Sequence, residues 1–161
     1  MKMLLWVLAF LILPLPLNAQ DPDKSKLEEN IYYRALVAAL TARAQDAKYA
    51  SGNDPLHQVI IMSDIQLNAG FPTSLVDTKV EYVTENDLRA RYRSKKDEIP
   101  VFVMRPMMNE GNRLVIHFTR YWFSTTKKGN AMSLEGGYRV VMVYDCARKE
   151  YVVESAKLWG I

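Results

Sequence analysis

The chain has 161 residues, a formal net charge of +3 at neutral pH and a hydrophobic content of 49%. This length is enough for one domain with a proper core, and the net charge is too small to imply nucleic acid or another polyanion as a partner. Cys146 is the only cysteine, which rules out an internal disulfide and with it the class of small secreted domains held together by cross-links.

The N-terminus has the layout of a secretory signal peptide. Lys2 provides a positive start, an unbroken apolar run follows, two prolines end it, and the small residue Ala19 stands before the expected cut. The apolar run is shorter than the roughly 20 residues that cross a bilayer. We therefore predict a cleaved signal peptide over residues 1–19, a single α+β domain over 20–161, a secreted or periplasmic location, and no stable membrane insertion after cleavage.

A long amphipathic helix is expected from about Lys26 to Tyr49. Ser25 and Glu28 have the spacing of a capping box, and apolar residues then recur on one broad face of an alanine-rich segment. Gly52 and Pro55 are expected to end the helix.

The segment that follows contains short elements. The apolar run Gln58–Ser63 predicts a buried strand, and Lys79–Val83 predicts another by its alternation. Residues 65–78 carry mixed signals with Gly70 and Pro72, which favours a loop.

A short helix is predicted over residues 84–96, with Thr84 and Asp87 in a capping pattern. Its second half, Arg89–Lys96, is rich in basic residues and raises the possibility of a nucleic-acid or anionic surface site. The helix dipole explains the same pattern, because acidic residues lie in the first turn and basic residues in the last. We adopt the second interpretation, and predict no nucleic-acid partner.

The second half of the chain is typical of an antiparallel meander. A turn with Gly111 joins the first two strands, and a flexible connection over 127–137 precedes the last two. The expected strands are 100–106, Arg113–Thr126, Tyr138–Tyr144 and Tyr151–Leu158. Strands that follow helices without βαβ alternation indicate α+β. The expected fold is a long N-terminal helix packed on a curved antiparallel sheet of these four strands plus one or two earlier ones.

This order of elements, helix first and sheet after, resembles the layout of NTF2-like and cystatin-like proteins. The resemblance covers most of the chain after the signal peptide and includes no motif. It implies a fold alone, because that architecture carries enzymes, binding proteins and scaffolds.

The strand Arg113–Thr126 holds the candidate site. His117, Thr119 and Tyr121 share one face of it, and can line a ligand pocket inside a cupped sheet. His117 and Tyr121 are candidates for general acid–base catalysis, although spacing positions no second histidine or acidic partner beside them. The alternative is that they are amphipathic side chains on the less buried side of the sheet.

Neither a metal site nor a cofactor site is predicted. His57 and His117 are the only histidines, and neither belongs to a ligand pair with metal-binding spacing. The paired glycines Gly136 and Gly137 precede a strand rather than a helix, unlike a phosphate-binding loop.

Cys146 lies between the last two expected strands, directly after Asp145, which is a good residue to start a turn. We interpret it as a turn residue with a free thiol and predict no disulfide. An intermolecular disulfide and a nucleophilic role are the alternatives.

These observations favour an exported, non-catalytic binding or interaction domain, whose partner is a small apolar ligand or a protein. Two alternatives remain open. One is an enzyme that acts on a small molecule with His117 and Tyr121, and the other is a periplasmic inhibitor or immunity-type protein.

Overall fold

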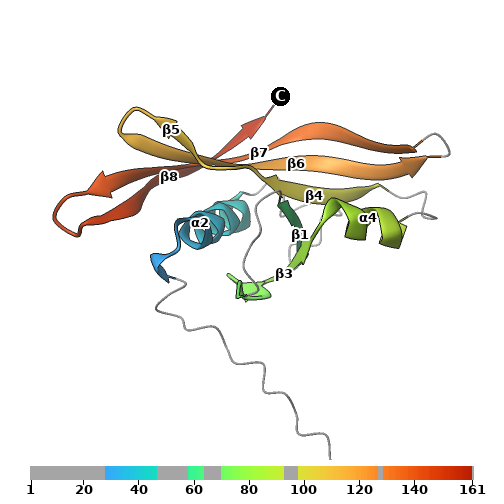
Figure 1. Cartoon of the computed structure of the whole chain (residues 1–161), viewed down its shortest axis with the longest axis horizontal. Coiled ribbons are helices and arrows are strands. Elements are labelled where there is room, and N and C mark those ends of the chain that lie inside the picture. Colours follow the sequence, from blue (N-terminus) through green and yellow to red (C-terminus); the bar gives the residue numbers. More distant parts are fainter. Residues whose placement is uncertain (1–27, 47–57, 64–69, 93–97, 127–128, 161) are drawn as a thin grey trace, which may run out of the picture.

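The fold is that of a computed structural model, which describes residues 28–46, 58–63, 70–92, 98–126 and 129–160 (Figure 1). The predicted signal peptide lies outside the described residues. The elements in chain order are α2 (Ile31–Gln45), β1 (Gln58–Ser63), β2 (Ser74–Leu75), β3 (Thr78–Val83), α4 (Glu85–Tyr92), β4 (Ile99–Met104), β5 (Met108–Glu110), β6 (Arg113–Thr126), β7 (Gly129–Asp145) and β8 (Glu150–Gly160).

All the strands form one curled sheet in the order β2-β3-β1-β4-β6-β7-β8, with β5 paired to β6. The α+β class is as predicted, but the sheet is not purely antiparallel. Strand β1 pairs in parallel with both β3 and β4, while all the other pairings are antiparallel. Parallel neighbours need a crossover connection, and α4, between β3 and β4, provides one that passes over β1.

Helix α2 is shorter than predicted, because it begins at Ile31 and ends at Gln45. Asn30 has an extended backbone, and its side-chain oxygen accepts hydrogen bonds from the backbone N–H groups of Tyr32 and Tyr33. An asparagine that captures these free N–H groups starts a new helix at its own position. The expected continuous helix is therefore wrong, because it is interrupted at Asn30. Its expected start at Lys26 and the predicted cap Ser25 lie outside the described residues.

Helix α4 begins as predicted. The Thr84 backbone N–H donates to the Asp87 carboxylate at 2.9 Å, and the Asp87 N–H donates to the Thr84 hydroxyl oxygen at 3.2 Å. This reciprocal pair is a capping box. The pKa of Asp87 is lowered by its hydrogen bonds with Thr84.

The two helices cover opposite faces of the sheet, and β1 and β3 lie between them (Figure 1). Along β1 and β4, alternate side chains point to the two sides. Ile61 and Phe102 belong to the core beneath α2, whereas Met62 and Val103 belong to the core beneath α4, around the buried Leu88. The central strands therefore contribute to both cores.

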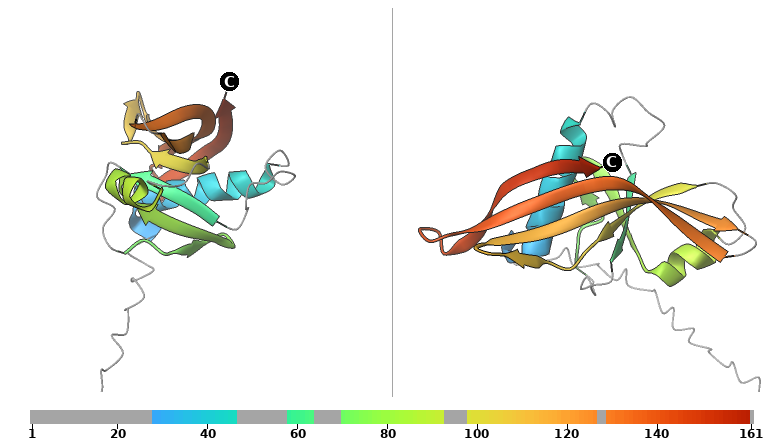
Figure 2. Two further views of the ribbon diagram at one scale, coloured as in Figure 1. Left: turned by 90° about the vertical axis from the view of Figure 1, so that its right-hand side faces the viewer. Right: turned by 90° about the horizontal axis from the view of Figure 1, so that it is seen from above.

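The C-terminal strands are longer than the sequence predicts. Strand β6 has the expected bounds, but β7 begins at Gly129, so the expected flexible connection over 127–137 is wrong for its described part. Residues 129–134 pair with the end of β6, and the register then shifts at Glu135. Strand β8 also has a shift, at Glu154. Such bulges increase local twist, and the views in Figure 2 show the C-terminal part of the sheet strongly twisted and curled.

Candidate functional site

The predicted site residues lie on the face of β6, β7 and β8 that is turned away from α2. We call this the outer face, and it points upward in Figure 1, where α2 lies below these strands. In register across the strands, His117 of β6 is opposite Arg139 of β7, which is opposite Lys157 of β8. On the other side of β6, the Arg105 N–H donates to the His117 carbonyl oxygen at 2.9 Å. These four residues form what we call the basic row.

Carboxylates compensate only part of the charge on the outer face. Glu110 of β5 forms an ion pair with Arg139 at 2.5 Å, and Glu154 of β8 forms one with Arg113 at 2.9 Å. Lys157 is exposed and has no ion pair with any residue in the described part of the chain. Carboxylates from β5 and β8 thus neutralise arginines of β7 and β6 on the outer face. Lys157 has no such carboxylate among the described residues, so its positive charge is in excess.

His117 is half-buried and contacts an aromatic ring from β8. The ring centroids of His117 and Trp159 are 5.7 Å apart, at an interplanar angle of 81°. Gly137 is the register partner of Trp159, and because it has no side chain the indole can lie across it toward β6. Burial of His117 lowers the pKa of its imidazole, Arg139 lowers it further, and Glu110 opposes both. The indole N–H of Trp159 has no hydrogen-bond acceptor among the described residues.

Thr119 and Tyr121 follow His117 along the same face, as the alternation predicts, but they have different surroundings. Thr119 is buried in the sheet. The Tyr121 ring packs against the core beneath α4, and its hydroxyl oxygen accepts a hydrogen bond from the Arg105 guanidinium at 3.0 Å. The contacts of His117 go to Trp159 and those of Tyr121 go to Arg105, so no direct contact joins the two predicted catalytic residues.

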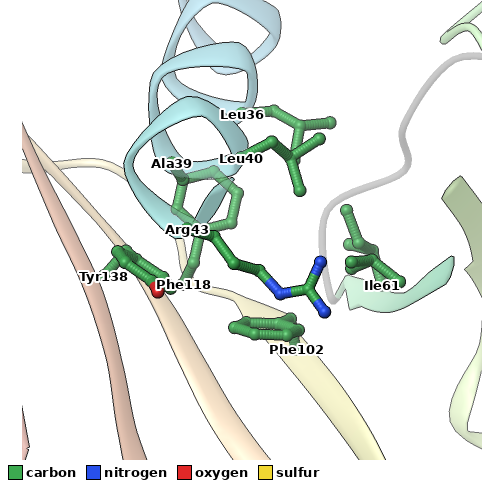
Figure 3. Close-up of a pocket in the computed structure, with 9 residues that line it drawn as sticks. Leu36, Ala39, Leu40, Arg43, Ile61, Phe102, Phe118 and Tyr138 are labelled. Carbon is green, nitrogen blue, oxygen red and sulfur yellow. The ribbon is translucent and has the colours of Figure 1, made fainter. Parts of the chain in front are cut away.

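The core beneath α2 contains a small cavity (Figure 3). Its volume is about 10 Å³, which is close to the space that one water molecule needs. The Arg43 side chain extends from α2 into this apolar site, where its guanidinium lies 6.0 Å from the centre of the Phe102 ring. The lining residues are Leu36, Ala39, Leu40, Arg43, Val59, Ile61, Phe102, Phe118 and Tyr138.

Arg43 and Arg120 are both buried, which sequence reasoning missed. Arg120 lies on the α2 side of β6, forms an ion pair with Glu135 at 3.1 Å, and packs over the Trp122 ring at 5.1 Å. One signal was present in the sequence, since Arg43 follows Ala39 and Leu40 at helical spacing on the apolar face. An arginine on a buried face needs partners, and the register that brings Glu135 to Arg120 depends on the bulge.

Other candidate features have ordinary surroundings. Arg89 pairs with Glu85, and Arg91 pairs with Glu81, so the described part of the basic run belongs to local ion pairs. Cys146 is exposed in the turn between β7 and β8. There the Asp145 carboxylate accepts hydrogen bonds from the backbone N–H groups of Ala147 and Arg148. Within the described ranges, no three His, Cys, Asp or Glu side chains gather as metal ligands would.

Neither of the two described helices is long and apolar enough to cross a membrane. No protein-family model, curated protein sequence or solved structure matches the chain.

Proposed function

We propose that this protein is an exported, non-catalytic binding domain that holds its ligand on the outer face of the sheet. The observation that carries the proposal is the basic row. Arg105, His117, Arg139 and Lys157 lie side by side across four neighbouring segments. Arg139 and Lys157 are cations directly opposite one another on neighbouring strands, and like charges so placed destabilise a sheet. A bound anion would offset that repulsion.

The packing beneath α2 supports a ligand on the surface rather than in the interior. Ligand pockets for small molecules have volumes of hundreds of Å³, whereas the cavity beside Arg43 has about 10 Å³. Phe102, Phe118 and Tyr138 belong to the buried cluster between α2 and the sheet. On the outer face, by contrast, the side chains of Arg105 and Lys157 are exposed to solvent.

The remaining hypotheses are less well supported. An enzyme that uses His117 and Tyr121 requires the two groups to act on one substrate, and their observed contacts go to different partners. The inhibitor or immunity-type hypothesis has no specific residue in its favour. We also propose that one part of the fold, α2 packed across β6, β7 and β8, has an NTF2-like or cystatin-like layout.

The proposal is tested by mapping ligands onto the backbone amide resonances of the protein in solution. A panel of neutral, cationic and anionic small molecules is titrated into the ¹⁵N-labelled chain. We expect binders to shift the amides of β6, β7 and β8 around His117, Arg139 and Lys157. A binder whose shifts centre on α2 and the cavity beside Arg43 contradicts the proposal, and so does a panel in which nothing shifts the outer face.

A further inference from the structure

We infer that the basic row is a binding site for an oxyanion, namely a carboxylate or phosphate group on the ligand, and that Lys157 is its principal contact. The inference rests on the proposed function and specifies the ligand's chemistry. The first argument for it is the register of His117, Arg139 and Lys157. Directly opposite residues on neighbouring strands have Cβ atoms about 4.5–5.5 Å apart. An anion above Arg139 is therefore within side-chain reach of both Lys157 and His117.

The other ion pairs around β8 show why Lys157 stands out. Arg113 pairs with Glu154 at 2.9 Å, and Arg34 of α2 pairs with Glu150 at 2.9 Å. These two cations, which face β8 from other elements, thus have carboxylates supplied by β8 itself, and Arg139 has Glu110 of β5. Lys157, on the same strand, faces Arg139 instead, and none of the described carboxylates is paired with it. An anion from outside would supply the missing opposite charge.

Each member of the row has a distinct part in such a site. Lys157 supplies a compact point charge on a flexible stem. Arg139 contacts Glu110 through one terminal nitrogen, and a guanidinium has five N–H donors, so donors remain for a second anion. His117 becomes a donor on both nitrogens when it is protonated. The Trp159 ring beside His117 offers an apolar surface to the part of the ligand next to its charged group.

The protonation of His117 is coupled to binding of the anion. The charged groups around it are Arg105 and Arg139 on the two neighbouring segments, Lys157 one strand further away on β8, and Glu110 on β5. Its pKa is lowered by burial and by Arg139. A bound anion favours the imidazolium and raises this pKa, so by linkage the anion binds more tightly as the pH falls through the pKa of His117.

The test uses the full protein and two probes, inorganic phosphate and acetate, each titrated at constant ionic strength. The imidazole C–H resonances report the pKa of His117, and amide shifts report the dissociation constant. We expect at least one probe to raise the His117 pKa and to bind at the row. Tighter binding of phosphate indicates a phosphate-bearing ligand, and tighter binding of acetate indicates a carboxylate-bearing one. In Lys157→Ala, affinity should fall by about two- to fivefold, the scale of losing one exposed ion pair.

Lys79→Ala is the matched control, because Lys79 is an exposed lysine on β3 and its removal changes the net charge equally. Equal weakening in both variants means that the anions respond only to net charge, and this overturns the inference, as does failure of both probes to move His117. If a neutral compound shifts the outer face and binds Lys157→Ala unchanged, the inference fails while the proposed function stands. If nothing in the neutral, cationic and anionic panel binds the outer face, both fail.

Discussion

At the scale of single residues, Asn30 decides where α2 begins. Its side chain satisfies two backbone N–H groups that the helix itself leaves free. We expect Asn30→Ala to lower the free energy of unfolding by about 1 kcal/mol, the usual cost of losing such a cap. Asn30→Asp keeps the acceptor oxygen and should cost little. Urea denaturation followed by circular dichroism measures both, and equal stability of Asn30→Ala and the unchanged protein would show that the cap is unimportant.

His117 provides a second prediction at this scale, from its lowered pKa. Since burial and Arg139 lower the pKa, the unfolded chain binds more protons than the folded chain just below the ordinary histidine value. Stability should therefore rise with pH through this window and decline as the pH falls below about 6.5. Arg139→Gln removes the cation and frees Glu110, so the pKa of His117 should rise.

Proton NMR titration measures the midpoint for His117 directly. The chain has one other histidine, His57, and His57→Gln assigns the two resonances. An unchanged midpoint for His117 in Arg139→Gln would mean that the two side chains do not interact electrostatically.

At the scale of elements, Gly137 maintains the pairing of β7 with β6. Its φ is +150°, and a Cβ atom at this position would lie 2.0 Å from the Phe118 carbonyl oxygen. Because backbone cannot yield as a side chain can, Gly137→Ala should lower the free energy of unfolding by at least about 2 kcal/mol. Amide exchange in β7 should increase as well.

Gly111 is the matched control for this substitution. It also has a positive φ, +70°, but nothing lies within 4 Å of its expected Cβ. Gly111→Ala should therefore show only the conformational cost of about 1 kcal/mol. Similar losses in the two variants, measured by chemical denaturation, would show that the close approach at Gly137 is relieved elsewhere.

The elements also show which features of the fold can be predicted from sequence. Strands β1 and β6 have the predicted bounds because each is a continuous run with clear turn or breaker residues beside it. The start of β7 was missed because its first residues, including Gly129 and Asn130, favour turns, while pairing with β6 makes them extended. The parallel pairing of β1 was missed because β3, α4 and β4 are too short to stand out as a βαβ unit.

At the scale of the whole molecule, the site depends on register, which the sequence does not display. Alternation along β6 placed His117, Thr119 and Tyr121 on one face correctly. The neighbours of His117 in the basic row come from the segment after β4 and from β7 and β8, and a bulge in each of the last two strands changes which of their residues point outward. One residue of slip would replace Arg139 and Lys157 by apolar neighbours. Local pattern therefore predicts candidates on one strand, and tertiary pairing determines their partners.

The two cores on opposite faces of the sheet should unfold together. Leu36 of α2 and Leu88 of α4 lie in different cores, and each is almost fully buried, at 1% and 0% exposure. Strands β1 and β4 contribute alternate residues to both cores, so neither core can form without the strands that the other stabilises. Leu36→Ala and Leu88→Ala should each cost about 2–5 kcal/mol and shift one common transition.

Tryptophan fluorescence and far-ultraviolet circular dichroism should report the same midpoint for each variant, as two-state unfolding requires. The double variant, if it folds, should lose the sum of the single losses to within about 0.5 kcal/mol, because the two residues share no direct contact partner across the sheet. Two separate transitions, with Leu88→Ala moving only one of them, would show that the α4 core and the α2 core are independent units. The shared strands would then act as a connection between units rather than as the centre of a single domain.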